Sequence, residues 1–182
     1  MANQIRIGVL VLVAGMVLVA LAVSRTEAAK DGFRFDAAKL KDHNTWIQVN
    51  NEPYQMPAPV AALCTAPGSL AAPNPHASSF ITVYVNKIGR EAMFAKQAQR
   101  YPEGSIIVKE KFSSPEDRKP LLYTIMRKRA AGYNPQVGDW EFSVVGPNGR
   151  ELQASGKLKN CQGCHVGKSE SDFVFRPYVK SE

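Results

Sequence analysis

Between residues 80 and 154 the chain repeats short runs whose apolar and polar positions follow the period of a β-strand. Residues 80–85 are almost all β-branched or aromatic, and Trp140, Phe142 and Val144 occupy alternate positions of the run 139–145. Alternation with period two places such side chains on one face of a strand. Similar runs at 105–112, 121–130 and 150–154 bring the expected strands to five.

Turn residues separate these runs. Gly-Pro-Asn-Gly at 146–149 predicts a hairpin, and Gly-Tyr-Asn-Pro at 132–135 predicts a turn. Helical spacing is limited to 91–100, to a short helix or turn at 33–43, and to the region around residue 161. Residues 45–49 form a short extended segment. The expected fold class is α+β, predominantly an antiparallel sheet with a few short helices in a single domain.

Six prolines between residues 53 and 75 interrupt the chain before the first long strand. Proline cannot donate to a β-ladder and breaks helices, so this density excludes a central strand or a long helix. The alanine and leucine residues among the prolines favour an irregular segment that packs on the core.

The N-terminus resembles an export sequence. Arg6 precedes an apolar run from Ile7 to Val23, and small residues then allow cleavage after Ala22 or Ala28. We therefore expect a signal peptide at 1–28 and a mature domain at 29–182, with an uncleaved membrane anchor as the alternative. Either arrangement exports the folded part and indicates a periplasmic location.

Asn160 to His165 reads Asn-Cys-Gln-Gly-Cys-His, which contains the C-x-x-C-H pattern of covalent haem attachment. Two thiols three residues apart on a short helix reach the two vinyl groups of one porphyrin, and the next imidazole can ligate the iron. The pattern predicts one covalent haem c bound by Cys161 and Cys164, with His165 as the axial iron ligand.

Other uses of the two cysteines fit the sequence less well. A structural zinc site needs a second ligand pair, and only the isolated Cys64, His43 and His76 remain. A thioredoxin-like dithiol belongs to a βαβ pattern that the sequence does not show. Cys64 itself is read as a small buried apolar side chain, with a reactive thiol or an intermolecular disulfide as the alternatives.

The chain of 182 residues has a formal net charge of +7. This charge suits an anionic partner or a membrane surface, and equally a solvated surface. The one basic cluster, Arg127-Lys128-Arg129, lies in an expected strand, so we expect no nucleic-acid partner.

Several of these stretches together resemble the cytochrome P460 family, which includes the sheet-type cytochromes c′-beta. The resemblance covers about residues 46–178. Its carriers are Thr82-Val83-Tyr84-Val85-Asn86, Pro102 to Glu110, Gly132-Tyr133-Asn134-Pro135 before Gly138-Asp139-Trp140, and Cys161 to His165 before Phe173-Val174-Phe175.

The resemblance implies an open, five-coordinate iron with His165 as the proximal ligand, on a sheet domain that is often a homodimer. Some members oxidise hydroxylamine, whereas c′-beta members bind nitric oxide. Enzymatic members carry a lysine cross-linked to the haem, and Lys109 matches that position. Strand alternation groups Lys109 with Ile107 and Lys111, which by itself leaves it equally fit to be a surface lysine.

The distal residue is not identified from the sequence, and the sheet is expected to form the distal wall. Arg176 is a candidate partner of the haem propionates, with a surface position as the alternative. Side chains that could bind iron as a sixth ligand are His76, Met56, Met93 and Met126. Candidates for the distal side by strand position are Phe80, Phe112, Tyr123, Arg127, Tyr133 and Glu141.

Two functional hypotheses follow, with hydroxylamine or small nitrogen oxides as partners. The first is an oxidoreductase for hydroxylamine or nitric oxide that passes electrons to an unidentified acceptor. The second is a nitric-oxide-binding protein without turnover. A six-coordinate electron-transfer cytochrome is a weaker third reading.

Overall fold

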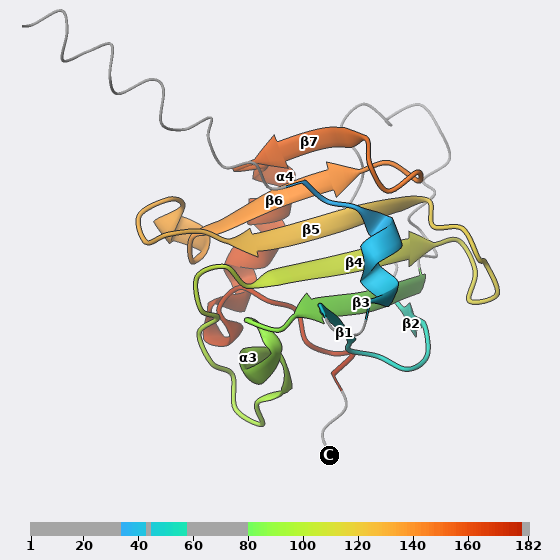
Figure 1. Cartoon of the computed structure of the whole chain (residues 1–182). Coiled ribbons are helices and arrows are strands. Elements are labelled where there is room, and N and C mark those ends of the chain that lie inside the picture. Colours follow the sequence, from blue (N-terminus) through green and yellow to red (C-terminus); the bar gives the residue numbers. More distant parts are fainter. Residues whose placement is uncertain (1–33, 43–44, 58–79, 180–182) are drawn as a thin grey trace, which may run out of the picture. The chain divides into compact units, whose positions relative to one another are not determined.

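The computed structural model describes residues 34–42, 45–57 and 80–179. Its centre is a seven-stranded sheet in which β1, β3, β4, β5, β6 and β7 are neighbours in that order, and β2 also pairs with β3 (Figure 1). Every pairing is antiparallel. The strands are β1 Trp46–Gln48, β2 Tyr54–Gln55, β3 Phe80–Asn86, β4 Ile106–Phe112, β5 Leu122–Lys128, β6 Trp140–Val145 and β7 Leu152–Gly156.

All helices in the described residues are short. They are η2 Ala37–Lys41, α3 Arg90–Phe94, η3 Pro135–Val137, α4 Lys159–His165 and η4 Val166–Ser171. The expected fold class, a mainly antiparallel sheet with a few short helices, is confirmed. No described helix combines the length and the apolar character that a membrane crossing requires. The expected signal peptide, Cys64 and His76 lie outside the described residues.

Strand alternation sorts the sheet into two faces. Ile81, Val83 and Ile107 belong to one apolar cluster together with the start of the α4 region, whereas Tyr84 and Val108 belong to another that packs beneath η2. In Figure 1, η2 lies on the near side of the sheet and α4 on the far side. The α4 side, called the α4 face below, carries the candidate site.

Helix α3 is shorter than the sequence predicts. The expected helix covered 91–100, but α3 ends at Phe94 and Ala95 is extended with a ψ of 137°. The guanidinium of Arg176 donates to the carbonyl oxygens of Met93 and Ala95 at 2.8 and 2.5 Å. A side chain 81 residues away therefore satisfies carbonyls at the helix end, and this contact leaves no periodic pattern in the sequence.

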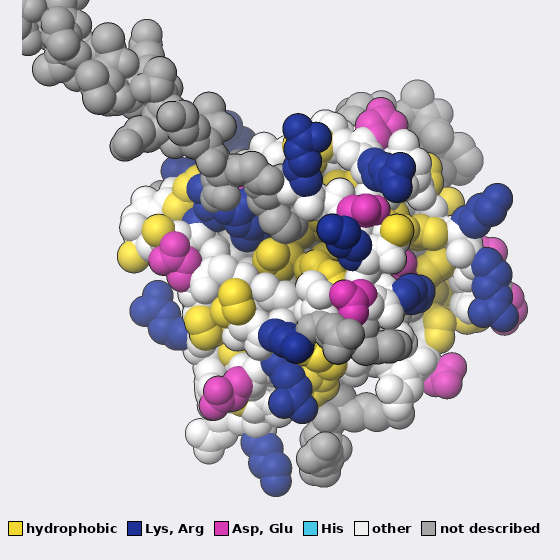
Figure 2. Space-filling view, viewed as in Figure 1, with side chains coloured by type: hydrophobic (Ala, Val, Ile, Leu, Met, Phe, Trp, Pro, Cys, Tyr) yellow, Lys and Arg dark blue, Asp and Glu magenta, His cyan; other side chains and the backbone are white. Residues whose placement is uncertain are grey.

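The basic cluster at the end of β5, Arg127-Lys128-Arg129, is largely paired within the fold. Lys128 forms a buried ion pair with Asp172, with 2.6 Å between Nζ and Oδ2. Arg129 pairs with Glu141 at 2.8 Å. On the face shown in Figure 2, lysine and arginine side chains are scattered and separated by other residues. These contacts favour a structural role for two of the three cationic residues.

The opposite face of the sheet buries a carboxyl group. Glu110 on β4 is 7% exposed, and the groups that face it are Lys41 from η2, Tyr84 from β3 and Tyr123 from β5. The Lys41 ammonium lies 3.9 Å from the carboxylate and 2.8 Å from the Tyr84 hydroxyl. Burial raises the pKa of Glu110, although Lys41 and the hydrogen bond from Tyr84 oppose that shift.

Replacing Glu110 by glutamine should raise the stability of the protein at neutral pH. Because the folded-state pKa is raised, the unfolded chain ionises first, and stability falls as pH rises above the ordinary value of 4.5. E110Q removes this loss, and we expect it to be more stable than wild type at pH 7, with the difference shrinking as the pH falls towards 4. Urea unfolding of the holoprotein from pH 4 to 7 measures it, with the exposed Glu103→Gln as control. Equal stability of E110Q and wild type across this range would contradict the prediction.

Candidate haem site

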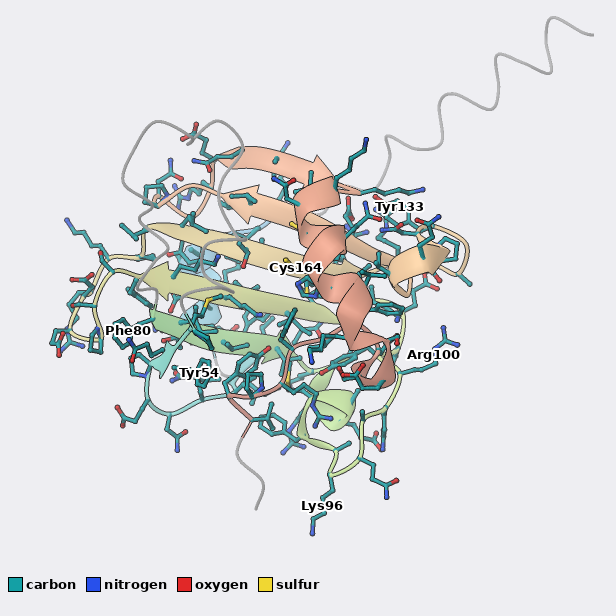
Figure 3. All side chains as sticks on the ribbon, turned by 180° about the vertical axis from the view of Figure 1, so that it is seen from behind. Tyr54, Phe80, Lys96, Arg100, Tyr133 and Cys164 are labelled. Carbon is teal, nitrogen blue, oxygen red and sulfur yellow. The ribbon has the colours of Figure 1, made fainter. Side chains whose placement is uncertain are left out.

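Helix α4 carries both cysteines of the C-x-x-C-H pattern. Its seven residues run from Lys159 to His165 across the α4 face, where Cys164 lies over the sheet (Figure 3). Cys161 and Cys164 are about one turn apart and both half-exposed. Both thiols line the same cavity on this face. The short helix thus presents two sulfur atoms side by side, which is the arrangement that attachment to one porphyrin needs.

The imidazole of His165 is held in one orientation. Its Nδ1 lies 2.6 Å from the carbonyl oxygen of Phe173, and because that oxygen can only accept, Nδ1 is the protonated nitrogen. The ring centroid is 5.1 Å from those of Phe142 and Phe175. These contacts leave Nε2 with the lone pair that an iron ligand uses.

His165 is neutral at pH 7. Burial, and then the charge of the neighbouring Lys109, lower the pKa of His165 to about 4. A neutral imidazole binds a metal without first losing a proton. Phe142 belongs to β6, so the sheet packs against the imidazole of His165, whereas the sequence leads us to expect that the sheet forms the distal wall.

Two cavities meet at α4. The larger, about 590 Å³, is lined by residues of β2, β4, the end of α4 and the segment 168–178. The smaller, about 60 Å³, lies between α4 and strands β4 to β6. Cys164, His165, Lys109 and Met56 line both cavities. A volume near 590 Å³ falls within the range of roughly 300–1,000 Å³ usual for cofactor pockets.

The chemistry of these residues fits a c-type haem. Two thiols one turn apart, a buried neutral imidazole and a cavity bordered by Phe175 and Tyr178 supply anchors, an axial ligand and apolar walls. Cys161 borders the smaller cavity and Cys164 borders both, so a group attached to both sulfur atoms would reach each cavity.

The structure brings Lys109 into this site. Its side chain is half-buried on the α4 face and lines both cavities. Its Nζ lies 5.8 Å from the ring centroid of Phe175 and 5.3 Å from that of Tyr178. A cation over two aromatic faces is held by their π-electrons. The resemblance implies a lysine beside the cofactor, and Lys109 lines both cavities at the cysteines of α4; its cross-link stays a prediction.

Arg176 lines the larger cavity and is anchored at one end. Its Nη2 donates to the two carbonyl oxygens at the end of α3, and its Nε is buried without a partner in the structure. The guanidinium therefore has a structural role and one buried donor to spare. Its pairing with a propionate stays a prediction.

Neither cavity is lined by any of the six distal candidates inferred from strand position. Phe35 packs against Tyr123 in the cluster under η2, and Glu141 pairs with Arg129. Phe80 and Tyr133 lie on either side of Cys164, toward opposite ends of the sheet (Figure 3). Strand position alone did not identify the distal side, because strand alternation does not show which face the cofactor occupies.

The methionines divide into two groups. Met93 is fully buried in α3, and its Sδ accepts a hydrogen bond from the Tyr101 hydroxyl at 3.5 Å. Met126 lines the smaller cavity, and Met56 lines both. Met93 is thus committed to the core, whereas Met56 and Met126 are close enough to the site to be tested as iron ligands.

Several residues of the site were not found as functional residues by sequence reasoning. Lys111 is 1% exposed and lines the smaller cavity with Thr124. Asp172 forms a buried pair with Lys128 and directly precedes Phe173, whose carbonyl oxygen is bonded to His165. Alternation had placed Lys111 on the same face as Lys109, and that pattern was the one available indication of its position.

The comparisons with known proteins agree with this geometry. The family model described as Cytochrome P460 matches residues 65–176. None of the curated proteins matches the chain. The matched segment includes Lys109, both cysteines of α4 and His165.

Proposed function

The chain belongs to the cytochrome P460 family of haem c cytochromes, and from this we propose that it binds or oxidises hydroxylamine and nitric oxide at an open iron site. In this proposal one haem is attached through Cys161 and Cys164, and His165 is its single axial protein ligand. The observation that carries the proposal is that these residues share one pair of cavities with Lys109.

The protein residues have distinct tasks in this site. Bound haem supplies an iron that can coordinate a small nitrogen ligand and change oxidation state. The neutral imidazole of His165 would offer Nε2 to the iron, with its orientation fixed by the Phe173 carbonyl. Phe175 and Tyr178 hold the Lys109 amine against their rings and line one wall of the larger cavity. Oxidation of hydroxylamine also releases protons, which need a nearby acceptor.

The optical spectrum of the reduced holoprotein separates the two main hypotheses. A strongly red-shifted, broadened Soret band, together with hydroxylamine-dependent reduction of a one-electron dye, supports the oxidoreductase. An ordinary c-type Soret band without dye reduction, but with nitric oxide binding, supports the binding protein. Absence of covalently attached haem from protein matured in a bacterial periplasm would contradict both.

A six-coordinate electron-transfer cytochrome is tested through the two methionines of the cavities. We expect a high-spin spectrum in both oxidation states for wild type, Met56→Leu and Met126→Leu, since their thioethers pack in the apolar cluster of the α4 face. Leucine has nearly the same volume and cannot ligate iron. Met93→Leu, in the core away from both cavities, is the control. A low-spin wild-type spectrum that becomes high-spin in one variant would establish a sixth ligand and overturn the open-site proposal.

The same proposal includes export of the domain and transfer of electrons to an unidentified acceptor. Attachment of c-type haem in bacteria takes place outside the cytoplasm, so residues 1–28 are proposed as a signal peptide with a periplasmic product. N-terminal sequencing of the secreted holoprotein reads the cleavage site, and retention of Met1 to Val23 on a membrane fraction would favour the anchor. A homodimer, as the family implies, is tested by the mass of the holoprotein in solution.

A further inference from the structure

A strained turn follows the helices that carry the proximal histidine. Asp172 and Phe173 have φ values of 51° and 65°, so two consecutive non-glycine residues adopt left-handed backbone. Aspartate enters this region with some ease, but phenylalanine rarely does. Such conformations persist where the surrounding structure fixes them, and they concentrate at functional sites.

Donors from three parts of the chain fix Asp172. Its Oδ2 accepts from the backbone N–H of Tyr101 at 2.7 Å and from the Lys128 ammonium at 2.6 Å. Its carbonyl oxygen accepts from the indole Nε1 of Trp140 at 2.7 Å. The Asp172 and Lys128 side chains are 4% and 7% exposed, so this pair is almost wholly shielded from water.

The turn also explains Asn134, Gly138 and Trp140, to which the proposed function assigns no task. Gly138 has a φ of 64°, and a Cβ there would come within 2.7 Å of the Phe173 ring and 2.9 Å of Asp172 Oδ1. The Asn134 side chain donates to the Trp140 carbonyl at 2.9 Å. Gly138 thus allows the turn to approach closely. Asn134 fixes the backbone of Trp140, whose indole donates to the Asp172 carbonyl oxygen.

The last residue of the strained turn bonds to His165, the proposed iron ligand. The carbonyl oxygen of Phe173, the residue directly after Asp172, accepts the hydrogen bond from His165 Nδ1 at 2.6 Å. A partner on the outer nitrogen of a ligating histidine fixes the ring and raises the basicity of the nitrogen that binds the metal. The direction of this carbonyl is therefore a means of adjusting the iron.

We propose that Asp172 is a positioning residue for His165: its buried pair with Lys128 and its bond from Trp140 hold the left-handed turn that aims the Phe173 carbonyl at Nδ1, and this turn lowers the reduction potential of the iron. The proposal rests on the proposed ligation of haem by His165. It adds a task for residues that do not line either cavity.

The test is Asp172→Asn and Trp140→Phe in the holoprotein. Asparagine tolerates left-handed backbone as aspartate does, so D172N removes the charge and keeps the shape of the side chain. W140F removes the indole donor together with part of a buried ring. We expect both to raise the ferrous-to-ferric ratio at a fixed potential, by about tenfold for D172N, which is 59 mV for one electron. The iron–histidine stretch in resonance Raman spectra should fall in both.

Glu141→Gln is the matched control. It breaks the ion pair between Arg129, the neighbour of Lys128, and Glu141 on β6, and it leaves the bonds of Asp172 and Phe173 in place. It should leave the potential and the iron–histidine stretch unchanged. If D172N and W140F lose only thermal stability and keep both wild-type values, Asp172 is purely structural and the inference is overturned. A wild-type protein without His165-ligated haem would instead contradict the proposed function, so the two failures are distinguishable.

Discussion

Replacing Cys161 and Cys164 together by serine is expected to abolish covalent attachment of haem. Both thiols lie about one turn apart on α4 and line one cavity, and a hydroxyl cannot form the thioether bond. Denatured C161S/C164S should therefore carry no haem by peroxidase staining after gel electrophoresis. Wild type matured in parallel should stain with one haem per chain.

Matched single variants sharpen this expectation. C161S or C164S alone should retain one thioether and show a pyridine haemochrome spectrum intermediate between c-type and b-type. Asn160→Ala changes a neighbouring residue that lines the smaller cavity and should leave staining unchanged. Covalent haem in the double serine variant would show that α4 is not the attachment site.

Replacing Lys109 by arginine is expected to have the second-largest effect. Arginine keeps the positive charge and the stacking on Phe175 and Tyr178. It cannot supply the amine that a cross-link needs. Joining that amine to a ring carbon removes one hydrogen from each, so the bond also requires an oxidant of the peroxide class.

K109R should lose the red-shifted Soret band and reduce hydroxylamine turnover by roughly 10- to 100-fold, while nitric oxide still binds. In the wild type, tryptic peptides should show the Lys109 peptide joined to the haem peptide. Lys168→Arg is the control, because Lys168 lines the same larger cavity and lies 5.6 Å from the Phe175 centroid. Identical spectra and turnover for K109R and wild type would remove Lys109 from the mechanism.

Local patterns predicted much of this molecule. Runs of alternating apolar residues, or of continuous β-branched and aromatic residues, identified five of the strands. A strand with a core on one face alternates buried and exposed side chains, whereas β3 is covered on both faces and reads as a continuous run. The spacing of Cys161, Cys164 and His165 identified the candidate haem helix, because the helical repeat places them together without help from the rest of the fold. Alternation grouped Lys109 with Ile107 and Lys111, and all three line the smaller cavity.

The end of α3 was not predicted correctly, and the sequence did not identify the distal residue. Glu91 to Arg100 contains good helix formers, but Arg176 satisfies carbonyls of Met93 and Ala95, and the chain leaves the helix there. Phe80, Tyr133 and the other strand candidates have suitable chemistry and line neither cavity. Their selection required knowledge of which face α4 covers, and that depends on contacts distant in sequence.

By itself, the sequence determined the sheet, the helix with the C-x-x-C-H pattern and the family, since each depends on spacing between residues that are near one another in the chain. The tertiary structure alone decided what surrounds His165. Asp172 and Lys128 are 44 residues apart, and Trp140 is 32 residues from the carbonyl it holds. Buried polar groups need hydrogen-bond partners, and these partners come from whichever segments the fold places beside them. Contacts between segments so distant in sequence leave no periodic pattern from which they could be predicted.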